Sequence, residues 1–133
     1  MNICCIGRNS ETFTERSANG EIKSRWSGGV ADDGRFLRHG KETWHYPNGE
    51  LHYEANSELG RKVGSEAFHR SDGTIAWRWQ HNRDGTSVWT QFWENGRKKS
   101  ESTWRGSVAN GKARTWDRSG RVLSDVNFMT GSL

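Results

Sequence analysis

Polar and apolar residues alternate along much of this chain, and Asn-Gly, Asp-Gly and Ser-Gly pairs interrupt the alternation. The clearest pair is Asn95-Gly96, which lies in the middle of the stretch from Trp89 to Trp104. Alternation with a period of two is typical of a strand with one covered face. An Asn-Gly pair between two such runs is typical of a two-residue hairpin turn. The stretch therefore predicts a β-hairpin.

The same pattern recurs at a nearly constant interval. The turn glycines are Gly20, Gly49, Gly73, Gly96 and Gly120, so that successive steps measure 29, 24, 23 and 24 residues. Steps of similar length are the mark of a repeat architecture. The longer first step indicates an insertion of about five residues within 28–34, which we expect to form a longer loop between the first two hairpins.

Counting from each turn glycine separates two kinds of position. The even positions, from +2 to +8, are largely apolar and include Leu51, Tyr53, Trp77 and Trp79, whereas position +5 is charged in every copy. We therefore expect strands with one apolar and one charged face. The +5 residues largely alternate in sign, and we expect them to pair across the sheet: Arg25, Glu54, Arg78, Glu101 and Asp125.

These strands account for the whole pattern, because no stretch has the three- and four-residue apolar spacing of a helix. We predict an all-β fold, an elongated single antiparallel β-meander of about five repeated β-hairpins. The repeat domain covers residues 13–133, and 1–12 form an N-terminal tail or cap strand. Further glycines are expected to take positive φ where hairpins connect: Gly40, Gly60, Gly64, Gly85, Gly106, Gly111 and Gly131.

The composition refines the expected shape. Only 31% of the 133 residues are hydrophobic and the mean hydropathy is −1.01, yet the chain contains eight Trp and five Phe. Aromatic side chains each bury a large area, so a few of them supply a thin core. We therefore expect one slim, extended domain rather than a thick globule.

Charge and cysteine content bear on the compartment and on partners. Twenty Lys and Arg are interleaved with sixteen Asp and Glu, which favours a solvated surface over a nucleic-acid footprint. The adjacent Cys4 and Cys5 have poor geometry for pairing with each other, and the start of the chain lacks the basic and apolar regions of a secretory signal. We expect a reduced, cytoplasmic protein.

Motifs of catalysis are missing from the sequence. There is no Gly-rich phosphate loop opening a helix, no G-x-S-x-G, no H-E-x-x-H and no deaminase signature. We expect no catalytic residues, no cofactor and no metal site, and hence a protein that is not an enzyme.

Several pieces of sequence resemble a known family. They are TWHYPNGELHYE, the connection Gly60 to Gly64, QFWENGRKKSES and RTWDRSGRVLSD. Together they resemble the MORN-type repeat, and more closely its variant in the YwqK family of antitoxins. The resemblance covers residues 36–131, with a degenerate copy near 13–28. It implies a twisted, MORN-like sheet of stacked hairpins that binds proteins without catalysis. Some relatives neutralise bacterial toxins, and classic MORN proteins act as scaffolds or contact membranes.

The position four residues before each turn glycine provides a candidate partner-binding stripe. It holds Arg16, His45, His69, Phe92 and Trp116, and we expect the last four side by side on the face opposite the other aromatic residues. We add Trp93, Arg97 and Lys98 from the Asn95-Gly96 hairpin, whose second strand departs most from the apolar pattern. The alternative is a one-residue slip in the last turn, which would place Trp116 on the apolar face.

Two other surfaces have competing interpretations. Trp77 and Trp79 would form a stacking platform for bases or sugars, or would simply fill the core, and the second interpretation is favoured. Basic residues would form an edge that attracts nucleic acid, anionic lipid or an acidic toxin, although interspersed carboxylates weaken it. They are Arg61, Lys62, Arg97, Lys98, Lys99, Arg105, Lys112 and Arg114.

The favoured function is that of a cytoplasmic antitoxin or immunity protein that binds and occludes a cognate bacterial toxin. The alternatives are a scaffold or membrane-surface module and, less favoured, a nucleic-acid or carbohydrate binder. The open edges of a single sheet also leave a monomer and an edge-paired dimer as alternatives.

Overall fold

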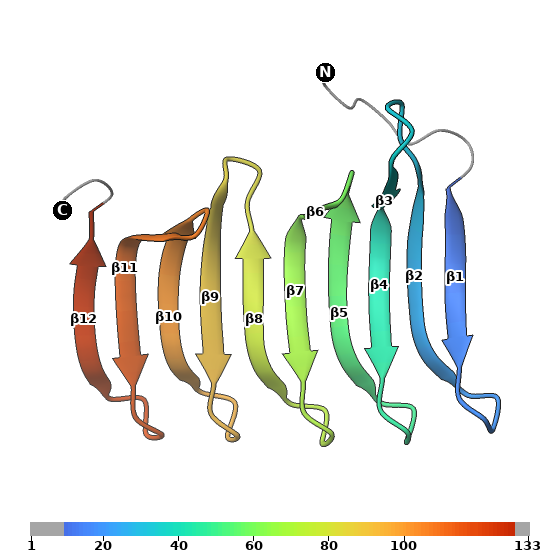
Figure 1. The fold of residues 1–133 in the computed structure, drawn as a ribbon. Coiled ribbons are helices and arrows are strands. Elements are labelled where there is room, and N and C mark those ends of the chain that lie inside the picture. Colours follow the sequence, from blue (N-terminus) through green and yellow to red (C-terminus); the bar gives the residue numbers. More distant parts are fainter. Residues whose placement is uncertain (1–9, 130–133) are drawn as a thin grey trace.

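The computed structural model describes residues 10–129 as one open antiparallel sheet (Figure 1). The sheet has 12 strands in the order β1-β2-β4-β5-β7-β8-β9-β10-β11-β12, with β3 paired to β2 and β6 to β5. The strands are β1 (Glu11–Arg16), β2 (Ile22–Val30), β3 (Phe36–Arg38), β4 (Gly40–His45), β5 (Leu51–Glu58), β6 (Arg61–Lys62), β7 (Gly64–His69), β8 (Ile75–His81), β9 (Thr86–Phe92), β10 (Lys98–Arg105), β11 (Val108–Trp116) and β12 (Val122–Phe128).

The predicted all-β meander of five hairpins is confirmed. The hairpins are β1–β2, β4–β5, β7–β8, β9–β10 and β11–β12, and their five loops lie along the lower edge in Figure 1. Residues 10–129 contain no helix, and therefore none long and apolar enough to cross a membrane. The predicted tail lies mostly outside the described residues, as do Cys4, Cys5 and Gly131, and β1 begins at Glu11, two residues before the predicted boundary.

The hairpin loops differ from the two-residue turns that the sequence predicts. In the second hairpin, the Tyr46 N–H donates to the Glu50 carbonyl at 2.9 Å and the Gly49 N–H donates to the Tyr46 carbonyl at 2.9 Å. Gly49 has a φ of 88°, and Leu59 is the one non-glycine residue among those described with positive φ. The loop therefore has three residues and ends on a left-handed glycine. The Asn48 carboxamide oxygen caps it by accepting from the Glu50 N–H at 2.9 Å.

The last hairpin replaces this cap. Ser119 occupies the position of Asn48, and the Asp117 carboxylate accepts from the N–H groups of Ser119 and Arg121 at 2.9 and 3.0 Å. The Ser-Gly turn that departs from the sequence pattern thus keeps its loop through an acidic residue two positions earlier.

Asp72, Asp84 and Asp117 should make the stability sensitive to acid. Hydrogen bonds from the hydroxyl and N–H groups of the following Thr or Ser residues lower the pKa of each carboxyl. Because the folded-state pKa is lowered, this stabilisation is present above the unfolded pKa, about 3.9, and is lost as the pH falls through the folded value. We expect the triple substitution of these residues by Asn to flatten the decline of unfolding free energy below about pH 4. Urea titrations from pH 6 to pH 2 measure it, and an unchanged slope would contradict this assignment.

A β-bulge follows every turn and changes which residues share a face of the sheet. In the second hairpin Trp44 pairs with Tyr53 but His45 pairs with Leu51, so that His52 is an extra residue. The same shift occurs in all five hairpins. Because paired residues project to the same face, position +2 lies opposite +4. The prediction that Leu51 belongs to the same face as Tyr53 was therefore wrong.

The insertion within 28–34 is also more ordered than the predicted loop. β2 continues to Val30, turns at Ala31–Arg35 and returns as β3, which pairs with β2 from Gly28 to Val30. A Cβ at Gly28 would meet the Leu37 carbonyl oxygen at 2.6 Å and the Phe36 ring at 3.0 Å. Glycine at this position therefore lets β3 approach β2 closely.

The sheet is a single layer, as the composition predicts. Its most buried residues are small or polar: Ser24, Ala31, Glu42, Ala55, Ser57, Ala67 and Thr90. Apart from the exposed Phe36 and Phe128, the aromatic side chains are half-buried. β1 and β12 form the two edges, and β12 exposes Val122, Leu123, Val126 and Phe128. Stability in such a fold depends on cross-strand contacts between side chains of one face.

Candidate binding surfaces

One face of the sheet carries most of the tryptophans, and we call it the aromatic face. Trp77 lies 5.1 Å from Trp89, and Trp79 lies 4.9 Å from Trp89 and 6.4 Å from Trp104, measured between ring centroids. Phe68 stacks on Trp77 at 5.7 Å. These rings are half-buried against one another across neighbouring strands. The contacts favour the core-filling interpretation of Trp77 and Trp79 over a free stacking platform.

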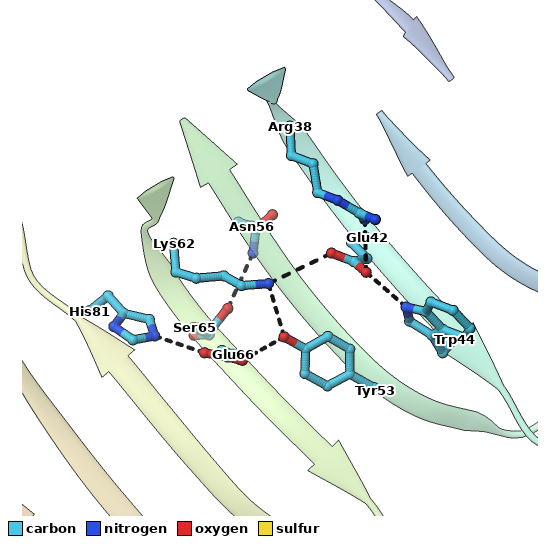
Figure 2. Close-up of polar contacts among 9 residues, drawn as sticks. All are labelled: Arg38, Glu42, Trp44, Tyr53, Asn56, Lys62, Ser65, Glu66 and His81. Atoms are coloured by element: carbon cyan, nitrogen blue, oxygen red, sulfur yellow. Dashed lines mark hydrogen bonds and ion pairs between the residues drawn. The ribbon is translucent and has the colours of Figure 1, made fainter. Parts of the chain in front are cut away.

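A chain of polar groups crosses the same face (Figure 2). Glu42 accepts from the Trp44 indole at 2.8 Å and pairs with Arg38 at 2.9 Å and Lys62 at 3.6 Å. The Lys62 ammonium also donates to the Tyr53 hydroxyl at 3.1 Å.

The chain continues through the Tyr53 hydroxyl, which donates to Glu66 at 2.5 Å, and Glu66 contacts the His81 Nε2 atom at 2.9 Å. Burial raises the pKa of the Tyr53 phenol far above its usual range, and the hydrogen bond and negative charge of Glu66 act in the same direction. The phenol therefore stays protonated as a donor between two carboxylates. All four carboxylate oxygens of Glu42 and Glu66 have partners. This polar chain therefore holds strands β4 to β8 together.

Sequence reasoning missed this polar chain. Glu42 and Glu66 both stand seven residues before a turn glycine, the position that Trp89 occupies in the fourth hairpin. The available signal was a carboxylate at a position that holds an apolar residue in the other three hairpins: Phe13, Trp89 and Ala113.

The opposite face carries the predicted stripe, which follows the loop end of the sheet. Each stripe residue pairs with the +2 residue of its hairpin, so that the turn-end row comprises His45, Leu51, His69, Ile75, Phe92, Lys98, Trp116 and Val122. Trp116 keeps this register without the alternative slip. The bulge thus gives the stripe apolar neighbours that the sequence analysis assigned to the other face.

Hydrogen bonding of the side chains in the turn-end row is incomplete. His69 Nε2 is buried without a hydrogen bond among the described residues, and Glu54 lies 3.6 Å from it. The Arg78 guanidinium lies 5.5 Å from the centre of the Phe92 ring. Arg97, Lys98 and Trp116 line a shallow hollow of about 270 Å³ together with Gly120. Three predicted site residues are therefore brought to one place.

Trp93 has a different position from the rest of the predicted site. Its ring lies between the Lys99 ammonium and the Arg118 guanidinium, each 4.7 Å from the centroid. Its indole N–H donates to the Trp116 backbone oxygen at 3.1 Å. Arg97 likewise donates to the Ser119 backbone oxygen. Both side chains therefore connect the fourth hairpin to the fifth.

The contact made by Trp93 recurs between earlier hairpins. The Tyr46 hydroxyl donates to the His69 backbone oxygen at 2.7 Å, and Arg70 donates to the Phe92 backbone oxygen at 2.6 Å. These inter-hairpin bridges all start from the third residue before a turn glycine. The sequence signal was a long donor side chain at this position, which the sequence analysis did not use.

Replacing Arg70 by Leu should destabilise the fold by about 1–2 kcal/mol. The Arg70 guanidinium also donates to Thr74 Oγ1 at 3.2 Å and to the Ile75 backbone oxygen at 3.1 Å, so that the substitution removes both the bridge and the support of its own hairpin. Urea unfolding measures the change. The matched control is Arg83→Leu, because the Arg83 side chain is 87% exposed and its ion pair with Glu58 is long, at 3.5 Å. Equal losses would contradict the role of the bridge.

Two electrostatic predictions need correction. The +5 residues do not pair directly, because Thr43, Ala67 or Thr90 lies between their strands and Arg114 pairs with Asp125 within the last hairpin. The basic residues do not form one edge either. Lys62, Lys98 and Arg114 are paired with Glu42, Glu101 and Asp125, and they lie on different faces and ends of the sheet.

Five hairpins with the same loop and bulge, three of them bridged to the next hairpin, define a β-hairpin repeat protein with two open faces. Residues 38–58, which include β4 and β5, match the family model of the MORN repeat variant. The match and the open sheet indicate a repeat-containing binding protein. No curated protein matches the chain. Among the described residues, no group of three or more His, Cys, Asp or Glu is arranged to hold a metal ion.

Proposed function

We propose that this chain is a cytoplasmic, non-catalytic antitoxin or immunity protein that binds a cognate bacterial toxin and covers its active surface. The observation that supports the proposal is the turn-end row, in which half-buried apolar, aromatic and His side chains lie beside the exposed Lys98 and Val122 on a sheet face without a covering layer. The resemblance to the antitoxins of the YwqK family supplies the class of partner.

The proposed contact centres on Phe92, Lys98 and Trp116. The hollow beside Trp116 would receive an apolar side chain of the toxin, while Arg97 and Lys98 at its rim would pair with acidic groups. A few buried aromatic anchors supply most of the binding free energy at such interfaces. The rigid repeat holds these anchors in place, since the bridge from Trp93 fixes the fourth hairpin against the fifth. Occlusion by this surface requires no chemistry from the chain.

Co-expression with the product of the adjacent gene tests the proposal. We expect the adjacent protein to arrest growth by itself and the wild-type chain to restore growth. The double substitution Phe92→Ala and Trp116→Ala should abolish the rescue, whereas Val88→Ala, on the same face of β9 but away from the loop end, should leave it intact. Absence of both a complex and a growth rescue would overturn the proposal.

A further inference from the structure

In the described part of the chain, the junction between the first and second hairpins has no inter-hairpin bridge of this kind. Tyr46, Arg70 and Trp93 each reach from their own loop to a backbone oxygen of the next hairpin. In the first hairpin the equivalent residue is Ser17, whose hydroxyl bonds to Asn19 and to the Glu21 carbonyl in its own loop. Among the described residues, no side chain donates to the His45 backbone oxygen, which is the equivalent acceptor.

A groove of about 510 Å³ occupies the place of the missing bridge. Its lining includes Ser17, Ile22, Lys23, His45 and Pro47, from the loops of the first two hairpins and the adjoining ends of β2 and β4. These loops are neighbours along the lower edge of the sheet in Figure 1. The groove is thus the space that a long side chain fills at the later hairpin junctions.

The walls of the groove match those that hold an aromatic ring elsewhere in the array. Trp93 lies against Lys99, the bulge residue of its hairpin, and against Arg118 of the next loop. Tyr46 stacks on the bulge residue of its own hairpin, His52, at 4.1 Å. At the first junction these two wall positions are Lys23 and Pro47, and both line the groove. A cation attracts the face of an aromatic ring, and the apolar proline ring offers a surface for it to pack against.

We propose that this groove binds an aromatic side chain with a polar hydrogen, tryptophan or tyrosine, presented by an acidic segment of a protein partner. The indole N–H or phenol O–H would donate to the His45 backbone oxygen, as Trp93 and Tyr46 do at their junctions. The groove lining holds two cations, Arg16 and Lys23, against one carboxylate, Glu21. The ion pair of Lys23 with Glu15 is long, at 3.7 Å, and exposed. The excess of positive charge in the lining disfavours an arginine in this place and favours flanking carboxylates. The inference rests on the proposed function as a binding protein and names a second contact for its partner.

Chemical-shift mapping with short peptides tests the groove on the intact chain. The probe is the acetylated, amidated tripeptide Asp-Trp-Glu, titrated into the isotope-labelled protein. We expect the shifts to concentrate on the amides of 17–23 and of His45 and Tyr46. The peptide Asp-Phe-Glu lacks the polar hydrogen and should bind about tenfold more weakly, the value of one net hydrogen bond.

Substitutions in the loops provide the matched controls. Ser17→Trp should fill the groove from within, abolish the peptide shifts and raise the Tm, whereas Ser71→Trp adds the same ring to another loop and should leave binding unchanged. Lys23→Glu removes one wall and reverses its charge, so it should weaken binding even if Ser17→Trp does not fold. Equal affinity of the two peptides, binding that survives Lys23→Glu, or no peptide shifts at all would overturn the inference. If the peptide binds but the chain does not rescue growth, the inference about the groove stands and only the proposed toxin partner is rejected.

Discussion

Replacing Trp79 by alanine should lower the free energy of unfolding by about 2–4 kcal/mol, the largest effect of a single aromatic substitution that we expect. The Trp79 ring contacts Trp89 at 4.9 Å, Trp104 at 6.4 Å and His81 at 5.7 Å. These contacts link β8, β9 and β10, so the ring joins the third hairpin to the fourth. In a single-layer sheet no second layer moves in to fill the space that the ring leaves.

Trp116→Ala is the control for this substitution. Trp116 is also half-buried, but it lies in the turn-end row on the opposite face, outside the contacts between rings of the aromatic face. We expect it to cost about 1 kcal/mol and to act mainly on partner binding. Urea unfolding of both variants at pH 7 measures the difference. Equal losses, or a loss below about 0.5 kcal/mol for Trp79→Ala, would show that the aromatic face does not hold the sheet together.

Glu42→Leu should destabilise the protein by about 2–3 kcal/mol. Glu42 is 9% exposed and accepts from the Trp44 indole while pairing with Arg38 and Lys62. Leucine would leave the half-buried Trp44 indole N–H without its acceptor and would remove the carboxylate that pairs with the exposed Arg38 and Lys62. Glu42→Gln keeps an oxygen for Trp44 and should cost less.

Glu58→Leu is the matched control, because the Glu58 side chain is 48% exposed and its ion pair with Arg83 is long, at 3.5 Å. We expect a change within about 0.5 kcal/mol for this exposed pair. Chemical denaturation at pH 7 compares the three variants. If Glu42→Leu proved as mild as Glu58→Leu, the polar chain in Figure 2 would be a consequence of the fold rather than one of its supports.

The sequence predicted the number of hairpins and the stripe of His45, His69, Phe92 and Trp116 because both depend on local signals. A left-handed glycine identifies each loop and is preceded by a capping Asn or Asp in four of the five, and its spacing sets the repeat. Trp116 lies in the same row as His45, His69 and Phe92 because every hairpin has the same register shift.

The bulge was not predictable from alternation. One extra residue, such as His52, changes which face every preceding residue occupies, and no residue type marks it: the equivalent positions hold Lys23, His52, Ala76, Lys99 and Leu123. The turn-end row therefore gained Leu51 and Ile75 only when the register was known.

The polar chain and the bridges depend on partners that are distant in sequence. Glu42 is balanced by Arg38 from β3 and by Lys62 from β6, two short strands that the repeat pattern does not contain. Tyr46 reaches an oxygen 23 residues later. A pattern counted within one hairpin cannot show contacts that exist only when hairpins stand side by side.

The central claim is that the turn-end row is the surface with which this repeat protein binds a protein partner. Isothermal titration of the purified chain with the product of the adjacent gene tests it most directly, with wild type, the double substitution Phe92→Ala and Trp116→Ala, and the control Val88→Ala. We predict a stoichiometric complex for wild type and for the control, and loss of binding for the double substitution while circular dichroism remains that of the folded sheet. Unchanged affinity of the folded double variant, or no binding by wild type, would contradict the claim.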